Sequence, residues 1–357
     1  MQLFFQGVFL LVGTVMGAGI FALPFSFSLS GLIPGILGMG LLAVVMIVLN
    51  LFYLQVIISA KGDHQLAGYT QKFLGKKWAK LALVINLFSL NAAVLAYIVL
   101  GREFLALVFA QLPSFWHSLC FWLWLFLLFW QGFHFLVKVE SFFVAGLVLL
   151  ILLICFLLSR FINLSNFSLI GSRPFFFWGP TLFALTGFSV IPEVEEVLRE
   201  KRKLLPKVII VGGLIPFLVY LLFSLTVWGI SGTVTTVDAL SGLVVFSPLL
   251  VRLGALVGLL ALTTSYLSLA NIIKETYFRD LKIESNLAKF LAVIPSLIGV
   301  ILPAQGFIKI ISLTGTVALA VAGVLISLMF IKVKPKYRWV AWLMVGVFLI
   351  GLLTTIG

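Results

Sequence analysis

Long apolar runs separated by short polar stretches dominate the pattern along the chain. A helix needs about 20 apolar residues to cross the hydrocarbon core of a membrane, and eleven runs meet this length. They cover residues 3–29, 33–59, 79–109, 115–134, 139–160, 175–198, 206–230, 248–275, 287–303, 306–331 and 338–356. The pattern predicts an all-α integral membrane protein with about 11 transmembrane helices.

Two of these runs contain helix-breaking residues at a depth where a spanning helix is normally continuous. Gly19 precedes Pro24 by five residues in the first run, and Gly187 precedes Pro192 by five in the sixth. Unwound backbone within a membrane must line a cavity or bind something. Close helix packing through small residues is the alternative explanation. Glycine- or proline-interrupted segments at matching positions of two halves favour a transporter site, which is the interpretation we prefer.

The spacing of the two breaks predicts the domain organisation. They lie five spans apart, and because five is odd, a second five-helix unit would be inverted in the membrane relative to the first. We therefore predict an inverted five-plus-five repeat with broken helices 1 and 6. The first repeat covers 1–160, the second covers 175–331, and an additional helix follows at 338–357.

Composition and charge agree with a membrane protein and predict its orientation. The chain is 62% hydrophobic and 10% charged, whereas soluble domains are about 45–50% apolar and about 25% charged. The net charge of +13 does not indicate nucleic acid, because the basic residues cluster between apolar runs. Placing the N-terminus in the cytoplasm puts 19 of the 24 basic residues in inner connections, as the positive-inside rule requires. The C-terminus is then outside the cell (plasma or inner) membrane, and the lipid bilayer is a partner.

Two stretches carry a family resemblance. The first reads Gly-Ala-Gly-Ile-Phe-Ala-Leu-Pro over residues 17–24. The second reads Phe-Ala-Leu-Thr-Gly-Phe over residues 183–188, and it is followed by Glu195-Glu196-Val197 and then by Pro206-Lys207. Both resemble the amino acid/polyamine/organocation superfamily of transporters, closest to its aromatic and neutral amino acid permeases. The helix layout of most of the chain is similar to that superfamily, although the motifs are specific only at these stretches.

The resemblance implies a substrate site between the unwound parts of helices 1 and 6, surrounded by helices 3, 8 and 10. The backbone of helix 1 would hold the carboxylate of an amino acid, carbonyls of helix 6 would hold its amino group, and two phenylalanines would contact its side chain. The substrate-binding residues implied in this way are Thr14, Gly17, Ala18, Gly19, Asn86, Phe183, Ala184, Leu185, Thr186 and Phe188. Ser89 and Asn91 either shape the same pocket or bond neighbouring helices.

The eighth run contains a pattern that resembles the sodium site of transporters with this fold. Ala261, Thr264 and Ser265 have the spacing Ala-x-x-Thr-Ser, and the resemblance adds the carbonyls of Gly13 and Met16. Hard neutral oxygens suit a small cation. The alternative is that the hydroxyls bond carbonyls of their own helix. Na⁺ is favoured over H⁺ because no titratable side chain lies clearly at mid-depth, and no cofactor is indicated.

Charged residues also suggest a gate. Glu195 and Glu196, on the inner half of the sixth run, are predicted either to pair with basic inner residues as a cytoplasmic gate or to lie at a solvated helix end. The prediction for the whole chain is a secondary active amino acid transporter that works by alternating access. An amino acid sensor that keeps the transporter fold is the alternative. An enzyme is disfavoured, because no convergent group of His, Asp, Glu or Cys is apparent.

Overall fold

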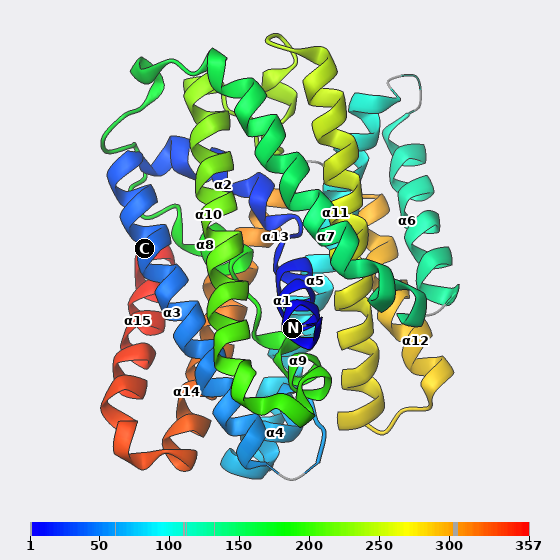
Figure 1. Cartoon of the computed structure of the whole chain (residues 1–357), viewed down its shortest axis with the longest axis vertical. Coiled ribbons are helices and arrows are strands. Elements are labelled where there is room, and N and C mark those ends of the chain that lie inside the picture. The colour runs from blue at the N-terminus through cyan, green and yellow to red at the C-terminus, as the bar shows by residue number, and fades with distance from the viewer. Residues whose placement is uncertain are drawn as a thin grey trace.

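The computed structural model describes residues 2–60, 62–109, 111, 113–131, 133–302 and 306–356, with the side chains of 133–143 and 354–356 left out. All regular elements in this part of the chain are helical, and most long helices run along the long axis of the molecule (Figure 1). They occupy every predicted run: α1 (Gln2–Val15) with α2 (Gly19–Ser30), α3 (Leu32–Ser59), α5 (Lys76–Val108), α6 (Ser114–Gln131), α7 (Phe133–Leu158), α8 (Trp178–Ala184) with α9 (Ile191–Val197), α10 (Leu205–Ser231), α11 (Pro248–Glu275), α12 (Ser285–Val293), α13 (Gly306–Leu313) with α14 (Leu319–Val333), and α15 (Arg338–Ile356).

Not every predicted run is a single long helix. Among the described residues, seven helices are long and apolar enough to cross a membrane, and the bent pair of α1 and α2 makes an eighth if it is one span. The runs that contain α6, α8 with α9, and α12 do not meet this test within the described residues. Their crossing of the membrane, the count of about 11 and the inverted repeat remain predictions.

The two prolines play different roles at the breaks. Pro192 lies in the first turn of α9, where its missing N–H would have no helical partner in any case. Pro24 lies inside α2, which resumes at Gly19. The chain leaves the helix over residues 16–18, within the stretch from Thr14 to Gly19 where unwound backbone was predicted, and Pro24 follows more than a turn later.

A short helix that the apolar runs did not predict lies at one end of the molecule. The segment was expected to be a loop between the second and third runs, but Leu66–Leu74 forms α4. Leu66, Ala67 and Thr70 are buried on one face, which is the spacing of an amphipathic helix. Gly75, at φ 92°, ends the helix, because a positive φ suits glycine.

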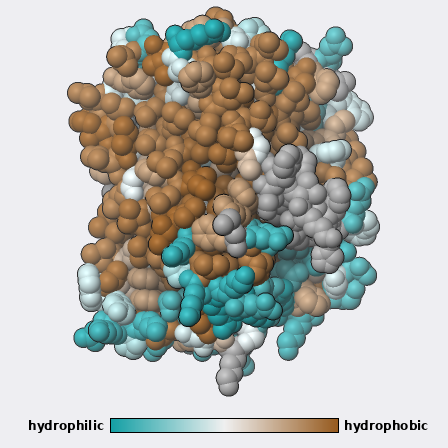
Figure 2. Space-filling view, in the orientation of Figure 1, coloured by the Kyte–Doolittle hydropathy of each residue, from teal (hydrophilic) through white to brown (hydrophobic). Residues whose placement is uncertain are grey.

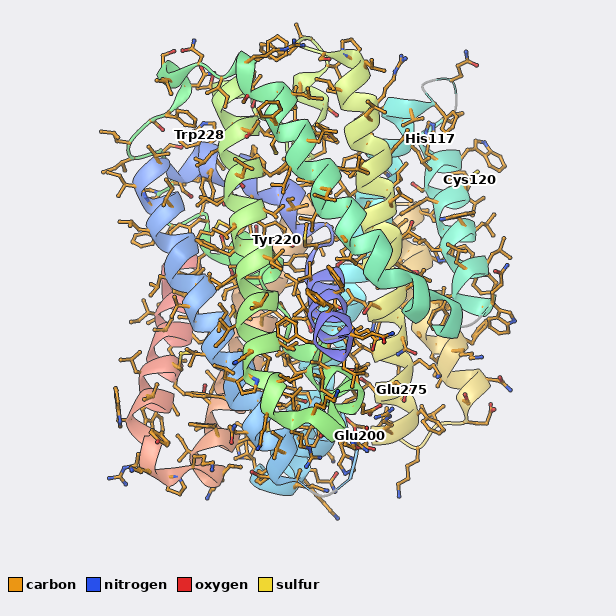
Figure 3. All side chains as sticks on the ribbon, viewed as in Figure 1. His117, Cys120, Glu200, Tyr220, Trp228 and Glu275 are labelled. Carbon is orange, nitrogen blue, oxygen red and sulfur yellow. The ribbon has the colours of Figure 1, made fainter. Side chains whose placement is uncertain are left out.

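Polarity divides the molecule along its long axis. Apolar residues cover a broad band of the visible face, and hydrophilic residues gather at the end where α4 lies (Figure 2). Glu200 and Glu275 lie at this same end, which we call the charged end (Figure 3). The broken α1 lies at the middle of the bundle, in front of α5 (Figure 1), and contacts α7, α9, α10 and α11. The break is therefore enclosed by helices rather than exposed on the apolar band.

Candidate functional site

The first break bends the chain at the centre of the bundle. α1 and α2 meet at 56°, and the N–H of Gly17 bonds the carbonyl of Val15 at 2.8 Å in place of a helical partner. Tyr220 lies on α10 (Figure 3). Its hydroxyl donates to the same carbonyl at 2.7 Å. The first N–H groups of α2 have no partner within their own helix and form the positive end of its dipole. An anionic group is therefore favoured beside Gly19.

Glycine is required at this break because neighbouring atoms approach closely. A Cβ on Gly19 would lie 2.5 Å from the Cα of Ala184, at the end of α8. A Cβ on Gly17 would lie 2.3 Å from the hydroxyl oxygen of Tyr97, on α5. The two broken spans thus touch through their backbones. The small residues of the break therefore serve close packing, and a substrate-binding role for the same residues stays a prediction.

The second break is built from short pieces. α8 ends at Ala184, residues 185–187 are not helical, and a 3₁₀ turn at Phe188–Val190 leads into α9. Helices of seven residues leave unpaired N–H and C=O groups near both ends. Thr186 compensates in part, because its hydroxyl donates to the Leu182 carbonyl at 2.6 Å.

A pocket lies between the two breaks. Its lining comes from the broken spans and from α5, α11, the π-helical turn Thr314–Ala318 and the start of α14. The lining residues are Thr14, Val15, Gly19, Asn86, Ser89, Leu90, Ala93, Tyr97, Phe183, Thr186, Phe188, Ser189, Leu269, Thr314 and Leu319. None of these described residues is charged. The pocket offers hydroxyls, one amide and aromatic rings.

Six of the ten residues predicted for substrate binding line this pocket. They are Thr14, Gly19, Asn86, Phe183, Thr186 and Phe188. The other four surround it: Gly17 and Ala18 lie in the break, Ala184 packs against Gly19, and Leu185 lines a separate small hollow beside α3 and α10. Their roles as backbone contacts to substrate stay predictions. Ser89 lines the pocket, whereas Asn91 is not among the lining residues and donates to the Leu87 carbonyl at 2.7 Å.

Several pocket residues were not predicted from the sequence, although helical spacing along the third run pointed to some of them. Asn86, Leu90, Ala93 and Tyr97 follow spacings of four, three and four residues, which place them on one face of a helix. Asn86 alone was predicted. Extending that face along α5 would have found Tyr97. Thr314 and Leu319 carried no comparable signal.

Of the two hydroxyls predicted to bind sodium, one bonds across to α1 and the other bonds a carbonyl of its own helix. The hydroxyl of Ser265 reaches across to α1 and donates to the Gly13 carbonyl at 2.8 Å. The Thr264 hydroxyl instead donates to Ala261, within its own helix, at 3.0 Å. Met16 is buried in the unwound segment. The donor set consists of neutral oxygens, which fit Na⁺ or another hard cation, and Ser265 already joins the two helices that would share it.

Both predicted gate residues take part in ion pairs at the charged end. Glu195 is 3% exposed, and its carboxylate lies 2.6 Å from Arg202 and 3.2 Å from Arg199. Arg199 also lies 2.6 Å from Asp63, in the connection between α3 and α4. A buried carboxylate needs such partners, since an unpaired one is costly. Glu195 therefore does not lie at a solvated helix end.

Glu196 joins a second element at the same end. It pairs with Arg279, which follows α11 in the π-helical turn Thr276–Asp280. Arg279 also lies 2.6 Å from Glu275, the last residue of α11. α9 is therefore tied both to the α3–α4 connection and to the end of α11. Beside these ion pairs, Gln65 donates hydrogen bonds to both Glu193 and Asp280. We call the residues of both sets of contacts the charged network: Asp63, Gln65, Glu193, Glu195, Glu196, Arg199, Arg202, Glu275, Arg279 and Asp280.

Comparisons with solved structures give the same fold. The crystal structure of MhsT in complex with L-phenylalanine has a TM-score of 0.72 at 14% identity, covering 97% of this chain and 98% of that one. A manganese transporter of Eremococcus coleocola, in a mutant form, has a TM-score of 0.67 at 14% identity, covering 99% and 86%. The same transporter with an aromatic bis-isothiourea compound has a TM-score of 0.65 at 15% identity, again covering 99% and 86%. These likenesses identify a transporter fold.

The sequence comparisons assign the family. No curated protein matches the chain significantly. The profile of the tryptophan/tyrosine permease family matches residues 1–357. Together with the transporter fold, this match makes the chain an amino acid transporter rather than an enzyme, with apolar helices that pass through a membrane several times. The chain belongs to the tryptophan/tyrosine permease family.

Proposed function

We propose that this protein is a secondary active transporter that carries aromatic amino acids across the membrane by alternating access. The observation that carries the proposal is the uncharged pocket between the two helix breaks. Aromatic side chains need a large apolar surface with few polar groups. Phe183, Phe188 and Tyr97 supply rings from two sides of this pocket.

The backbone at the breaks would bind the common part of the substrate. The N-terminus of α2 at Gly19 suits the carboxylate, because helix N–H groups and the helix dipole favour an anion. Carbonyls near Ala184 and Leu185 suit the ammonium group, since the last carbonyls of α8 lack helical partners. In this arrangement the side chain extends toward α5 and the Thr314–Ala318 turn.

We propose Na⁺ as the coupling ion, bound by the Gly13, Met16 and Ala261 carbonyls and by the Thr264 and Ser265 hydroxyls. The hydrogen bond between Ser265 and Gly13 supports this choice, because it brings two of the five oxygens together across α1 and α11. Binding of the ion would order α1 against α11 and so favour one conformation of the break. Proton coupling is the alternative.

The remaining parts of the proposal concern orientation and gating. We place the charged end in the cytoplasm and the C-terminus outside the cell membrane, because basic residues concentrate on cytoplasmic loops. The Glu195 and Glu196 ion pairs would then form the cytoplasmic gate. The two five-helix repeats would move relative to each other around the pocket, as inverted-repeat transporters do.

Uptake into proteoliposomes tests the function directly. We expect accumulation of radiolabelled phenylalanine, tyrosine or tryptophan under an inward Na⁺ gradient at matched pH. Uptake driven only by a pH gradient would support the transport function but would refute the proposed sodium site. Binding of these amino acids without uptake under either gradient would favour a sensor. Absence of both binding and uptake would refute the proposed substrate class.

A further inference from the structure

Glu193 in the charged network makes no ion pair with a basic side chain in the described part of the chain. Glu193, on α9, accepts a hydrogen bond at Oε1 from Gln65 Nε2 at 2.8 Å. Its Oε2 is buried and has no hydrogen-bond partner among the described residues. Glu195 and Glu196, on the same helix, each pair with arginine.

A second unpartnered polar group lies near Glu193, toward the substrate pocket. Tyr53, on α3, is 1% exposed, and its hydroxyl has no partner among the described residues. α3, which carries Tyr53, packs against α9, which carries Glu193. The Tyr53 ring packs edge-on against Phe188, with centroids 6.3 Å apart, and Phe188 lines the pocket. Glu193 therefore belongs to the layer that closes the pocket from the charged end.

Burial of Glu193 and the charge of Glu196 disfavour its ionised form, whereas the Gln65 hydrogen bond and the charge of Arg279 favour it. Its interacting or neighbouring titratable groups are Tyr53 on α3, Tyr69 on α4, Glu195 and Glu196 on α9, Arg279 and Asp280 in the turn after α11, and His64 in the α3–α4 connection. Arg279 is already held by Glu196 and Glu275. Burial and the nearby Lys72 lower the pKa of His64, so at neutral pH it adds no cation.

Gln65 couples this carboxyl to the moving parts of the gate. Its side chain bonds Glu193, and its backbone N–H donates to Asp280 at 3.1 Å. The N–H of Gly68, in α4, donates to the other oxygen of Asp280 at 3.0 Å. One residue thus joins α9, the start of α4 and the turn after α11. Separation of α9 from Gln65 would open a route for water to the shielded Oε2.

We propose that Glu193 is a proton-binding site of the inner gate, protonated while the Gln65 contact is closed and ionised when that contact opens. On opening, the O–H bond of the carboxylic acid breaks, the proton passes to water on the inner side, and the carboxylate is hydrated. On closing, the carboxylate takes a proton from that water and loses its hydration. The proposal rests on the alternating-access function proposed above. Low inner pH then favours the closed gate.

The test measures the opening of the gate as a distance between two spin labels, so it does not depend on transport. Spin labels are placed at the exposed Gln71, in α4, and Lys203, beyond α9, after replacing Cys120 with Ser and Cys155 with Ala. Distances between the labels are measured in nanodiscs at pH 5.5 and 8.5. In this parent protein we expect the longer-distance population to grow about tenfold with rising pH.

Three variants identify the group responsible. Glu193→Gln, which mimics the protonated acid, should keep the short distance at both pH values. Glu200→Gln changes an exposed glutamate and should behave as the parent. Glu193→Asp keeps a carboxyl and should retain a pH response, which covers the case in which Glu193→Gln fails to fold.

Two results would overturn the proposal. The first is a distance between the spin labels of the parent protein that does not change with pH. The second is a full pH response in folded Glu193→Gln. That result would assign the titration to another group, for example to His64 and Asp280. The uptake assay separates this failure from failure of the proposed function. A protein whose gate titrates through Glu193 but which carries no amino acid would refute only the transport proposal.

Discussion

The central pocket and the charged network differ in the chemistry of their side chains, and we propose that the first binds substrate and the second gates access to it. The described residues that line the pocket are all uncharged, whereas the network contains three arginines and six acidic residues among its ten residues. Backbone groups and hydroxyls can hold a zwitterion without a fixed charge. Ion pairs at the charged end can break and form again as helices move, provided that the separated charges become hydrated. Binding and gating are therefore expected to respond to different mutations.

The largest effect is expected where backbone approaches backbone at the pocket. Gly19→Ala places a Cβ 2.5 Å from the Cα of Ala184, and the two breaks must separate to accommodate it. Because misplacement by about 1 Å at a reacting or binding site can cost about 100-fold, we expect substrate binding and uptake to fall by that order. Gly40→Ala is the control, since its Cβ meets nothing within 4 Å. Normal uptake by Gly19→Ala would show that the breaks need not touch.

The next effect separates the ion site from the pocket. Thr264→Ala should weaken the sodium dependence of uptake about 10- to 100-fold, the value of a hydrogen-bond or ligand contact to a charged group. Thr263→Ala is a matched control, because Thr263 bonds its own helix at the Leu259 carbonyl and lies outside the proposed ligand set. Equal sodium curves for the two variants would remove Thr264 from the ion site.

A mutation in the charged network should change rate rather than affinity. Glu196→Gln removes the charge that holds Arg279, and we expect transport to slow about tenfold while the Kd for substrate changes less than about twofold. Stopped-flow uptake and equilibrium binding measure the two quantities. Glu200→Gln serves as control because Glu200 is exposed. Wild-type flux in Glu196→Gln would contradict a gating role for this pair.

The smallest effect concerns selectivity within the pocket. Thr314 is 1% exposed and lines the pocket, and its hydroxyl has no hydrogen-bond partner among the described residues. It is available to the phenol or indole of a substrate, so Thr314→Val should lower the preference for tyrosine and tryptophan over phenylalanine about fivefold, which is roughly 1 kcal/mol. Thr314→Ser should keep it. An unchanged preference in competition assays would remove Thr314 from side-chain recognition.

Those features of the site that depend only on neighbouring residues in the sequence were predictable. Both breaks follow from glycines and a proline in apolar runs, because helix disruption is a local property. Local patterns did not reveal α4, since its polar face interrupts the apolar signal that marks spanning helices. The glycines located the first break, whereas Pro24 lies inside the helix that starts five residues earlier.

The sequence by itself determined that this is a helical membrane protein, where its helices lie along the chain, and where two of them break. Hydropathy and helix propensity are sums over neighbouring residues, so they can be read without a fold. Only the tertiary structure decided which residues share the pocket, that Ser265 meets Gly13, and that Glu193 is covered by Gln65. Those contacts join segments up to 252 residues apart. They depend on the relative rotation and depth of packed helices, which no local pattern encodes.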